Sequence, residues 1–349
     1  MKLISTTLAL AFTAILANVA VAAPASAALS ESRVSDDTHW VADFDVAVKQ
    51  AREEGKDLLI DFTGSDWCSW CIKLHDEVFS HEEFMSYATA NYVLVALDYP
   101  RSDEAKARVP NPDRNRELAS QYKVNGFPTV LLMTPDGDVF GRTGYQPGGP
   151  EAYVTHLTEL RNEGLQALND AIKLVAEFDA AEGDARKAVL VKILDVIEGL
   201  NPESPIVSRL EAPARKAFTL DPDNAEGLKL RALKALLTAG QTSEDLIAMG
   251  RELDPKNMHG VLELVVFAQF GRVEQESDLA VCSNALDALL EVGPIQAKDK
   301  AIFMLANAAI WNHQFLGDPE RAKKYAARAL DLEIDDPNLV ARLKEIADV

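Results

Sequence analysis

Two cysteines that lie three positions apart, Cys68 and Cys71, are the residues of this chain best suited to chemistry. The segment Trp67-Cys68-Ser69-Trp70-Cys71 follows a short apolar run and leads into residues with helical spacing, which predicts Cys68 at a helix N-terminus. Free backbone N–H groups and the helix dipole there favour a thiolate over a thiol. A thiolate attacks disulfides, and a second cysteine one turn later can resolve the mixed disulfide. The pair is therefore predicted to be a reversible dithiol–disulfide couple.

The residues around this pair predict alternating helices and strands that would hold it in place. Helices are expected at 40–54, 72–79, 81–90 and 151–160, and buried strands at 57–62, 92–97, 130–133 and 139–140. A capping box is expected at Ser80-His81-Glu82-Glu83. Residues 99–118 read as a polar loop that enters a helix ending near Tyr122. This order implies a central mixed sheet that is covered on both faces.

At this point the chain resembles the thioredoxin superfamily, and in particular its exported members that carry a Trp-Cys-x-Trp-Cys centre. The resemblance rests on the centre at 67–71, on the preceding Leu59-Ile60-Asp61-Phe62, and on Gly126-Phe127-Pro128-Thr129 downstream. It covers residues 40–162 and implies an α/β thioredoxin-like domain over residues 38–163.

The resemblance also implies roles for individual residues. Cys68 would be the nucleophile and Cys71 the resolving thiol. Pro128 would be cis, and its loop, with Phe127, would face the cysteines and bind the substrate backbone. Asp61 resembles a buried carboxylate that takes or relays a proton from Cys71.

The chain departs from the family pattern in three places. The interval from Asp61 to Cys68 is one residue longer than in ordinary thioredoxins, which puts the reach of Asp61 to Cys71 in question. Residues 99–118 are an insertion, expected to be a surface loop rather than a rim over the site. The pair Ser69-Trp70 replaces Gly-Pro, and the intervening pair influences the acidity of the first cysteine. Trp70 would shield the thiol and, with Trp67, contact substrate.

Other interpretations of the same residues remain open. The two cysteines could form a structural disulfide, or half of a metal site with His75 and His81, although zinc needs four converging ligands. Haem attachment is excluded because Ile72, not histidine, follows the second cysteine. Asp61 could be a satisfied core carboxylate, and the two tryptophans could be core residues.

Residues 1–27 are predicted to be a secretory signal peptide. Lys2 gives a positive start, residues 3–23 are apolar, and Ala25-Ser26-Ala27 is a small-x-small cleavage site, with Ala20-Val21-Ala22 as a second candidate. An uncleaved membrane anchor is the alternative. Export predicts a periplasmic or secreted protein, in a compartment where disulfides persist, with no membrane insertion after cleavage.

Residues 164–349 are predicted to be helical throughout and resemble a tetratricopeptide-like repeat array. Phe218–Ala225 recurs as Arg251–Met258, thirty-three positions further on, with a third variant at Leu332–Asn338. Gly317–Leu330 resembles the second helix of a tetratricopeptide unit, whereas residues 270–300 fit poorly. Such arrays usually present a groove to a partner. Alternatively, these helices pack on the first domain or form a dimer contact. Cys282 is expected to be a buried small apolar residue.

The composition narrows the classes of function. The chain of 349 residues has 55 acidic against 35 basic side chains, and a net charge of −20 argues against nucleic-acid binding. We therefore expect an exported thiol–disulfide oxidoreductase that exchanges disulfides with cysteine pairs of other exported proteins and with an unknown redox partner. It would need no dissociable cofactor and no metal, and the helical domain would supply partner contacts. The alternatives are a protein-binding scaffold with the thioredoxin fold as an adaptor, and a thiol-based metallochaperone.

Overall fold

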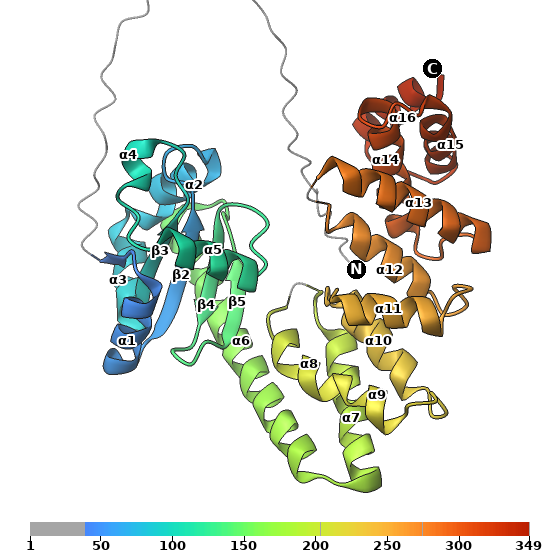
Figure 1. Ribbon diagram of the computed structural model, residues 1–349. Coiled ribbons are helices and arrows are strands. Elements are labelled where there is room, and N and C mark those ends of the chain that lie inside the picture. Colours follow the sequence, from blue (N-terminus) through green and yellow to red (C-terminus); the bar gives the residue numbers. More distant parts are fainter. Residues whose placement is uncertain (1–38, 203, 274, 349) are drawn as a thin grey trace, which may run out of the picture. The chain divides into compact units, whose positions relative to one another are not determined.

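The computed structural model describes residues 39–202, 204–273 and 275–348, so the signal-peptide prediction lies outside the described residues. A five-stranded sheet with strand order β1-β3-β2-β4-β5 forms the first part of the fold (Figure 1). Both β1 and β2 run parallel to β3, whereas β4 runs antiparallel to β2 and β5, which confirms the predicted mixed sheet. The strands are β1 (Trp40–Val41), β2 (Asp57–Thr63), β3 (Tyr92–Asp98), β4 (Thr129–Met133) and β5 (Val139–Thr143).

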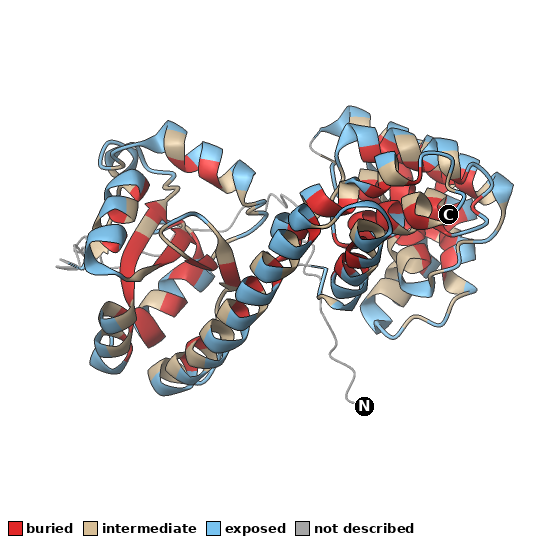
Figure 2. Ribbon diagram, turned by 90° about the horizontal axis from the view of Figure 1, so that it is seen from below, coloured by how far each residue is buried: buried red, intermediate tan, exposed pale blue. Residues whose placement is uncertain are grey.

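The central strand β2 sends alternate side chains into hydrophobic cores on opposite faces of the sheet, as the strand geometry requires. Leu58, Ile60 and Phe62 enter one core, which also contains residues of α1 (Phe44–Glu54) and α5 (Pro112–Gln121). Leu59 enters the other core, which contains residues from α3 (Glu82–Asn91) and α6 (Gly149–Ala180). Figure 2 shows the strands as mostly buried and the surrounding helices as exposed on their outer faces.

The local structure differs from the sequence expectation in three places. Trp40 and Val41 are a short strand rather than the start of a helix, because they pair with β3. The expected loop at 99–118 contains the short helix α4 (Asp103–Lys106) and the start of α5. Helix α3 (Glu82–Asn91) begins after His81 without a side-chain cap, so the expected capping box does not form.

Helix α6 (Gly149–Ala180) is 32 residues long and runs without a break through the expected domain boundary at 163/164. It packs on β5 and α3, and also on α7 (Gly183–Gly199) and α8 (Val207–Arg215). At Gly164 the helix approaches β5 so closely that an added Cβ would lie 2.0 Å from the carbonyl oxygen of Phe140. Glycine is therefore required here by close packing and not by a loop.

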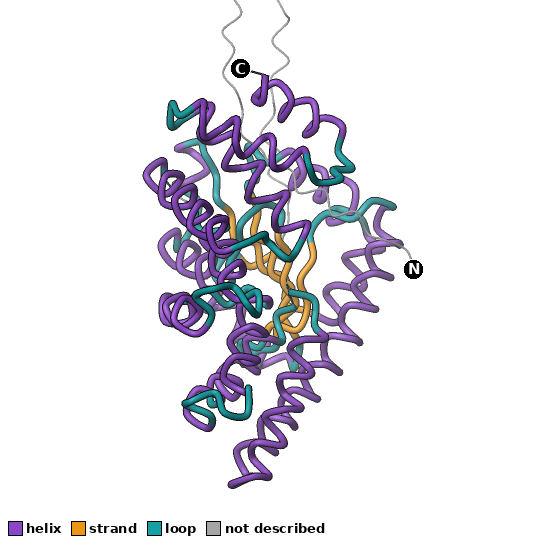
Figure 3. Tube along the Cα trace, turned by 90° about the vertical axis from the view of Figure 1, so that its right-hand side faces the viewer, coloured by secondary structure: helices purple, strands orange, loops and turns teal. Residues whose placement is uncertain are grey.

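The strands all lie before residue 144. After that point the described chain consists of helices and the loops that connect them (Figure 3). Within the described residues, no helix combines the length and the apolar character needed to cross a membrane. After α8 the elements are α9 (Ala217–Leu220), α10 (Leu228–Thr238), α11 (Glu244–Leu253), α12 (Val261–Phe270), α13 (Glu276–Val292), α14 (Lys298–Gln314), α15 (Pro319–Leu330) and α16 (Pro337–Asp348).

The two sequence repeats form the same local structure thirty-three residues apart. The carboxylate of Asp221 accepts the backbone N–H of Leu228, and that of Asp254 accepts the N–H of Val261, both at 2.9 Å. Each bond spans seven residues and satisfies a donor at the start of the following helix, which would otherwise lack a partner. The recurring Asp-Pro segments are therefore helix-start motifs.

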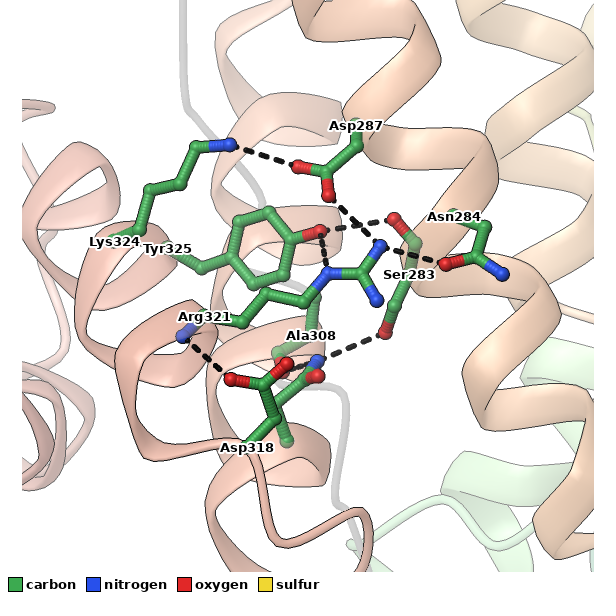
Figure 4. A network of polar contacts seen from close by, with 9 residues as sticks. Ser283, Asn284, Asp287, Ala308, Asp318, Arg321, Lys324 and Tyr325 are labelled. Carbon is green, nitrogen blue, oxygen red and sulfur yellow. Dashed lines mark hydrogen bonds and ion pairs between the residues drawn. The ribbon is translucent and has the colours of Figure 1, made fainter.

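A polar network connects α13, α14 and α15 (Figure 4). Tyr325 donates its hydroxyl to the carbonyl oxygen of Ser283 at 2.9 Å, and Arg321 bonds to Asn284 and pairs with Asp287, both at 2.8 Å. Cys282 lies next to this network, and burial raises the pKa of its thiol to about 11. The cysteine is buried, as the sequence predicts, and its thiol is held in the neutral form.

The close approach at Gly164 predicts that Gly164→Ala destabilises the protein even though alanine is the better helix former. We expect a loss of roughly 1–3 kcal/mol in the free energy of unfolding, because the new methyl group must displace the β5 backbone. The matched control is Gly199→Ala, since a Cβ at Gly199 would meet nothing within 4 Å. Urea denaturation checks this, and equal stability of the two variants would contradict the packing of α6 on β5.

Candidate functional site

The cysteine pair lies where the chain leaves the sheet and enters a helix. Cys68 is the N-cap of α2 (Ser69–Leu74), which continues directly into the π-helical segment η1 (His75–Phe79). The two cysteines are joined by a disulfide with an S–S distance of 2.11 Å and a Cα–Cα distance of 5.2 Å. The backbone N–H of Cys71 donates to Sγ of Cys68 at 3.1 Å. The sulfur of Cys68 therefore accepts a hydrogen bond from one of the backbone N–H groups that have no partner within the helix.

Both cysteines are largely covered, whereas the residues between them lie on the surface. Cys68 is 6% exposed and Cys71 is 5% exposed, but Trp70 is 53% exposed. Ser69 is also exposed. The disulfide is thus recessed directly beneath a surface that a partner can contact.

Trp67 is fixed on one side of the pair by three separate contacts. Its Nε1–H donates to the carbonyl oxygen of Tyr99 at 2.8 Å. Its ring packs edge-on against Phe127, with centroids 5.8 Å apart, and the guanidinium of Arg101 lies 3.9 Å from its centroid. The start of the 99–118 insertion, which was expected to be only a surface loop, therefore contacts the segment next to Cys68.

The loop that contains Pro128 lies beside this segment. The Phe127–Pro128 peptide bond is cis, which is what the family resemblance implies. Phe127 contacts Trp67 and also Tyr99, with ring centroids 5.1 Å apart in the second case. The structure thus brings together two of the sequence-predicted contact residues, Trp67 and Phe127, which are far apart in the sequence.

Trp70 packs against a residue that the sequence reasoning missed. Its ring lies 5.1 Å from that of Tyr145, and Nζ of Lys73 lies 5.2 Å and 4.9 Å from the two ring centroids. The hydroxyl of Tyr145 donates to Glu77 at 2.6 Å. Tyr145 belongs to the loop 144–148 between β5 and α6, whose glycines and proline indicate a turn but do not reveal its spatial neighbour. The only available signal was an aromatic residue in an otherwise polar loop.

Asp61 lies on β2 and is buried, with 7% of its surface exposed. Side chains two positions apart share a face of a strand, so Asp61 lies on the same face as Leu59, which is the face covered by α6 and by Leu74 of α2. Burial raises the pKa of the Asp61 carboxyl to about 7, opposed by a hydrogen bond from Thr63 and assisted by the charge of Asp98. Its Oδ1 atom is buried without a hydrogen-bond partner.

Histidines near the cysteines do not assemble a metal centre in the described part of the chain. No group of three or more histidine, cysteine, aspartate or glutamate residues there is arranged to hold an ion. Nε2 of His81 lies 3.1 Å from the carbonyl oxygen of Asp76, five residues earlier in the chain.

Comparisons with known proteins agree with this geometry. A family model described as a thioredoxin-like domain matches residues 44–157. The chain is 36% identical over 109 residues to the disulfide bond reductase DsbH of Chlamydia pneumoniae. The matched segment is 31% of this chain and 64% of that protein. It is 30% identical over 152 residues to the thioredoxin-related protein DsbJ of the same organism, covering 43% of this chain and 39% of that protein.

A third relative is the thiol:disulfide interchange protein DsbD of Pseudomonas fluorescens. The identity is 34% over 96 residues, which are 28% of this chain and 15% of that protein. The chain thus spans less than two thirds of the length of each of these relatives.

The burial of Asp61 predicts a pH-dependent stability that Asp61→Asn removes. An aspartate in the unfolded chain titrates near 3.9, whereas Asp61 in the folded protein titrates near 7. Between these values the folded state holds more protons than the unfolded state, so stability falls as the pH rises from about 4 to 7. The advantage of Asp61→Asn in free energy of unfolding should widen by up to about 3 kcal/mol between pH 5 and pH 8.

Urea denaturation of the oxidised proteins at the two pH values measures this difference. Asp103→Asn is the control, since the side chain of Asp103 is fully exposed. A pH dependence of unfolding that is the same in Asp61→Asn and in wild type would contradict the raised pKa of Asp61.

Proposed function

We propose, on the premise that residues 44–157 form a thioredoxin-like domain, that this chain is a thiol–disulfide oxidoreductase acting through Cys68 and Cys71. The observation that carries the proposal is the bonded cysteine pair at the first turn of a helix, with the N–H of Cys71 directed at Sγ of Cys68. A metal centre or a purely structural disulfide would not need this placement. The match to proteins named disulfide bond reductase and thiol:disulfide interchange protein supports the same chemistry.

In the reducing direction, the Cys68 thiolate attacks one sulfur of a substrate disulfide. A Cys68–substrate disulfide forms, and the other substrate sulfur leaves as a thiolate. The Cys71 thiolate then attacks Sγ of Cys68, which closes the Cys68–Cys71 disulfide and releases the second substrate thiolate. Two electrons pass to the substrate, and the oxidising direction reverses these steps. The N–H of Cys71 stabilises negative charge on Cys68 whenever that sulfur is a thiolate.

Asp61 is proposed to accept the proton of Cys71 during the resolving step. Its carboxyl has a pKa of about 7 and lies on the sheet face that α2 covers. A base with a pKa near the working pH is well matched to deprotonate a thiol. The buried Oδ1 without a partner is the atom available to receive this proton.

Trp67, Trp70, Phe127 and Pro128 are proposed to contact the substrate. Trp67 and Phe127 form an aromatic contact on one side of the cysteine pair, and Trp70 with Tyr145 forms another. The cis Pro128 lies near both aromatic contacts. It directly follows Phe127, and its carbonyl oxygen would lie 2.9 Å from an added Cβ at Gly144, the residue before Tyr145. Each of these aromatic contacts includes a tryptophan that directly precedes one of the two cysteines in the sequence.

The substrates are proposed to be exported proteins with cysteine pairs, and a further thiol protein would exchange electrons with Cys68–Cys71. The signal-like residues 1–27 support export to the periplasm or the exterior. The reducing direction is favoured by the name of the matched protein DsbH, a disulfide bond reductase. The repeated Asp-Pro helix starts support a tetratricopeptide-like array over 164–349 that provides partner contacts.

This function predicts that Cys71→Ala accumulates mixed disulfides with exported proteins through Cys68, because the resolving thiol is missing. Nonreducing gels and mass spectrometry of the trapped species measure this. Cys68→Ser is the matched control and should trap at least about tenfold less, since it lacks the N-cap thiol whose sulfur accepts the N–H of Cys71. A Cys71→Ala protein whose Cys68 is alkylated by iodoacetamide but which traps no partner would contradict the exchange function.

A further inference from the structure

The three residues that precede Cys68 are tied by polar contacts to the end of β3 and to the start of the 99–118 insertion. The backbone N–H and the hydroxyl of Ser65 donate to the carboxylate of Asp98 at 2.9 and 2.6 Å. The carboxylate of Asp66 accepts the backbone N–H of Arg101 at 2.9 Å and that of Ser102 at 2.7 Å. Trp67 donates to the carbonyl oxygen of Tyr99. Side chains on one segment thus satisfy backbone groups on the other.

Asp66 has the central part in this arrangement because it binds the residue whose side chain covers Trp67. Its carboxylate holds the backbone of Arg101, and the guanidinium of Arg101 lies 3.9 Å from the centre of the Trp67 ring. The Trp67 ring also lies close to Gly64, where an added Cβ would be 2.7 Å from ring atoms. Removing the Asp66 carboxylate would release both the 101–102 backbone and the cation that it positions.

The exposed surroundings of Asp66 indicate that it is not held in place by packing. Asp66, Arg101 and Ser102 are all on the surface, so the contact is made by charge-assisted hydrogen bonds. These two backbone donors hold the pKa of Asp66 down at about 2. The carboxylate is therefore ionised under any condition in which the protein is assayed.

We propose that Asp66 is a positioning residue, which fixes Trp67 as one wall of the substrate site by holding residues 101–102 against the segment before Cys68. This inference rests on the proposed function, because it gives Trp67 a substrate to contact. It also accounts for the extra residue between Asp61 and Cys68, since the longer segment is ordered by bonds to the insertion. Asp66 itself does not touch the reacting sulfur atoms in this proposal.

The test compares a protein disulfide with a small one. Asp66→Ala should raise KM for insulin by about tenfold with little change in kcat, because a misplaced wall weakens binding and not the exchange step. The rate at which reduced Cys68 reacts with the small aromatic disulfide dithiobis(nitrobenzoate) should stay within about twofold of the wild-type rate. Asp66→Asn should have a KM for insulin between those of wild type and Asp66→Ala, since its amide oxygen still accepts a hydrogen bond but carries no charge.

Asp103→Asn is the matched control, because it removes one exposed carboxylate from the same insertion and should leave both rates unchanged. An unchanged KM in Asp66→Ala, or an equal loss of reactivity toward insulin and the small disulfide, would overturn the inference. Failure of the proposed function itself would look different, because wild type would then reduce insulin no faster than Cys68→Ser.

Discussion

The pairing of β2 with two neighbours at once is the constraint on which the site depends. β2 is parallel to β3 and antiparallel to β4, with Asp61 opposite Ala96 and Val130. β2 ends at Thr63, and the segment that follows turns from Gly64 to Cys68, the N-cap of α2. β4 begins directly after the cis Pro128. One set of backbone hydrogen bonds thus places the cysteines, the buried carboxylate and the proline loop.

The surroundings of two acidic groups near this point shift their pKa values in opposite directions. Burial raises the pKa of Asp61 to about 7, so that its carboxyl changes protonation state near neutral pH, whereas Asp66 lies on the surface and is kept ionised by hydrogen bonds from backbone N–H groups. A carboxyl that can change its protonation state is useful for moving a proton, and one that cannot is useful for holding a structure. We therefore propose that the same residue type serves two purposes, which the sequence alone does not separate.

Much of the architecture could be predicted because it depends on local patterns. The apolar runs gave the four main strands, and Cys68, Cys71 and the Gly-Phe-Pro-Thr segment pointed to a helix start and a proline loop. The Asp-Pro repeats marked helix starts through a local hydrogen bond. Each of these signals lies within a few residues of the structure that it specifies.

The contacts between distant segments could not be predicted from the sequence. Tyr145 reaches Trp70 across 75 positions, and Asp66 reaches Arg101 across 35, so neither pair leaves a local pattern. Gly164 lies next to the expected domain boundary, which the change from a mixed to an all-helical pattern indicates, and only the assembled fold shows that this glycine permits close packing of α6 on β5. Side-chain partners of this kind depend on the assembled sheet.

The central claim is that the Cys68–Cys71 pair exchanges its covalent bond with that of another protein. Its most direct measurement is a single turnover, in which fully reduced protein is mixed with one equivalent of insulin and all thiols are then alkylated and weighed by mass spectrometry. One Cys68–Cys71 disulfide is expected to form for each insulin disulfide that is lost. Protein that stays fully reduced while insulin remains oxidised, with both cysteines open to alkylation, would contradict it.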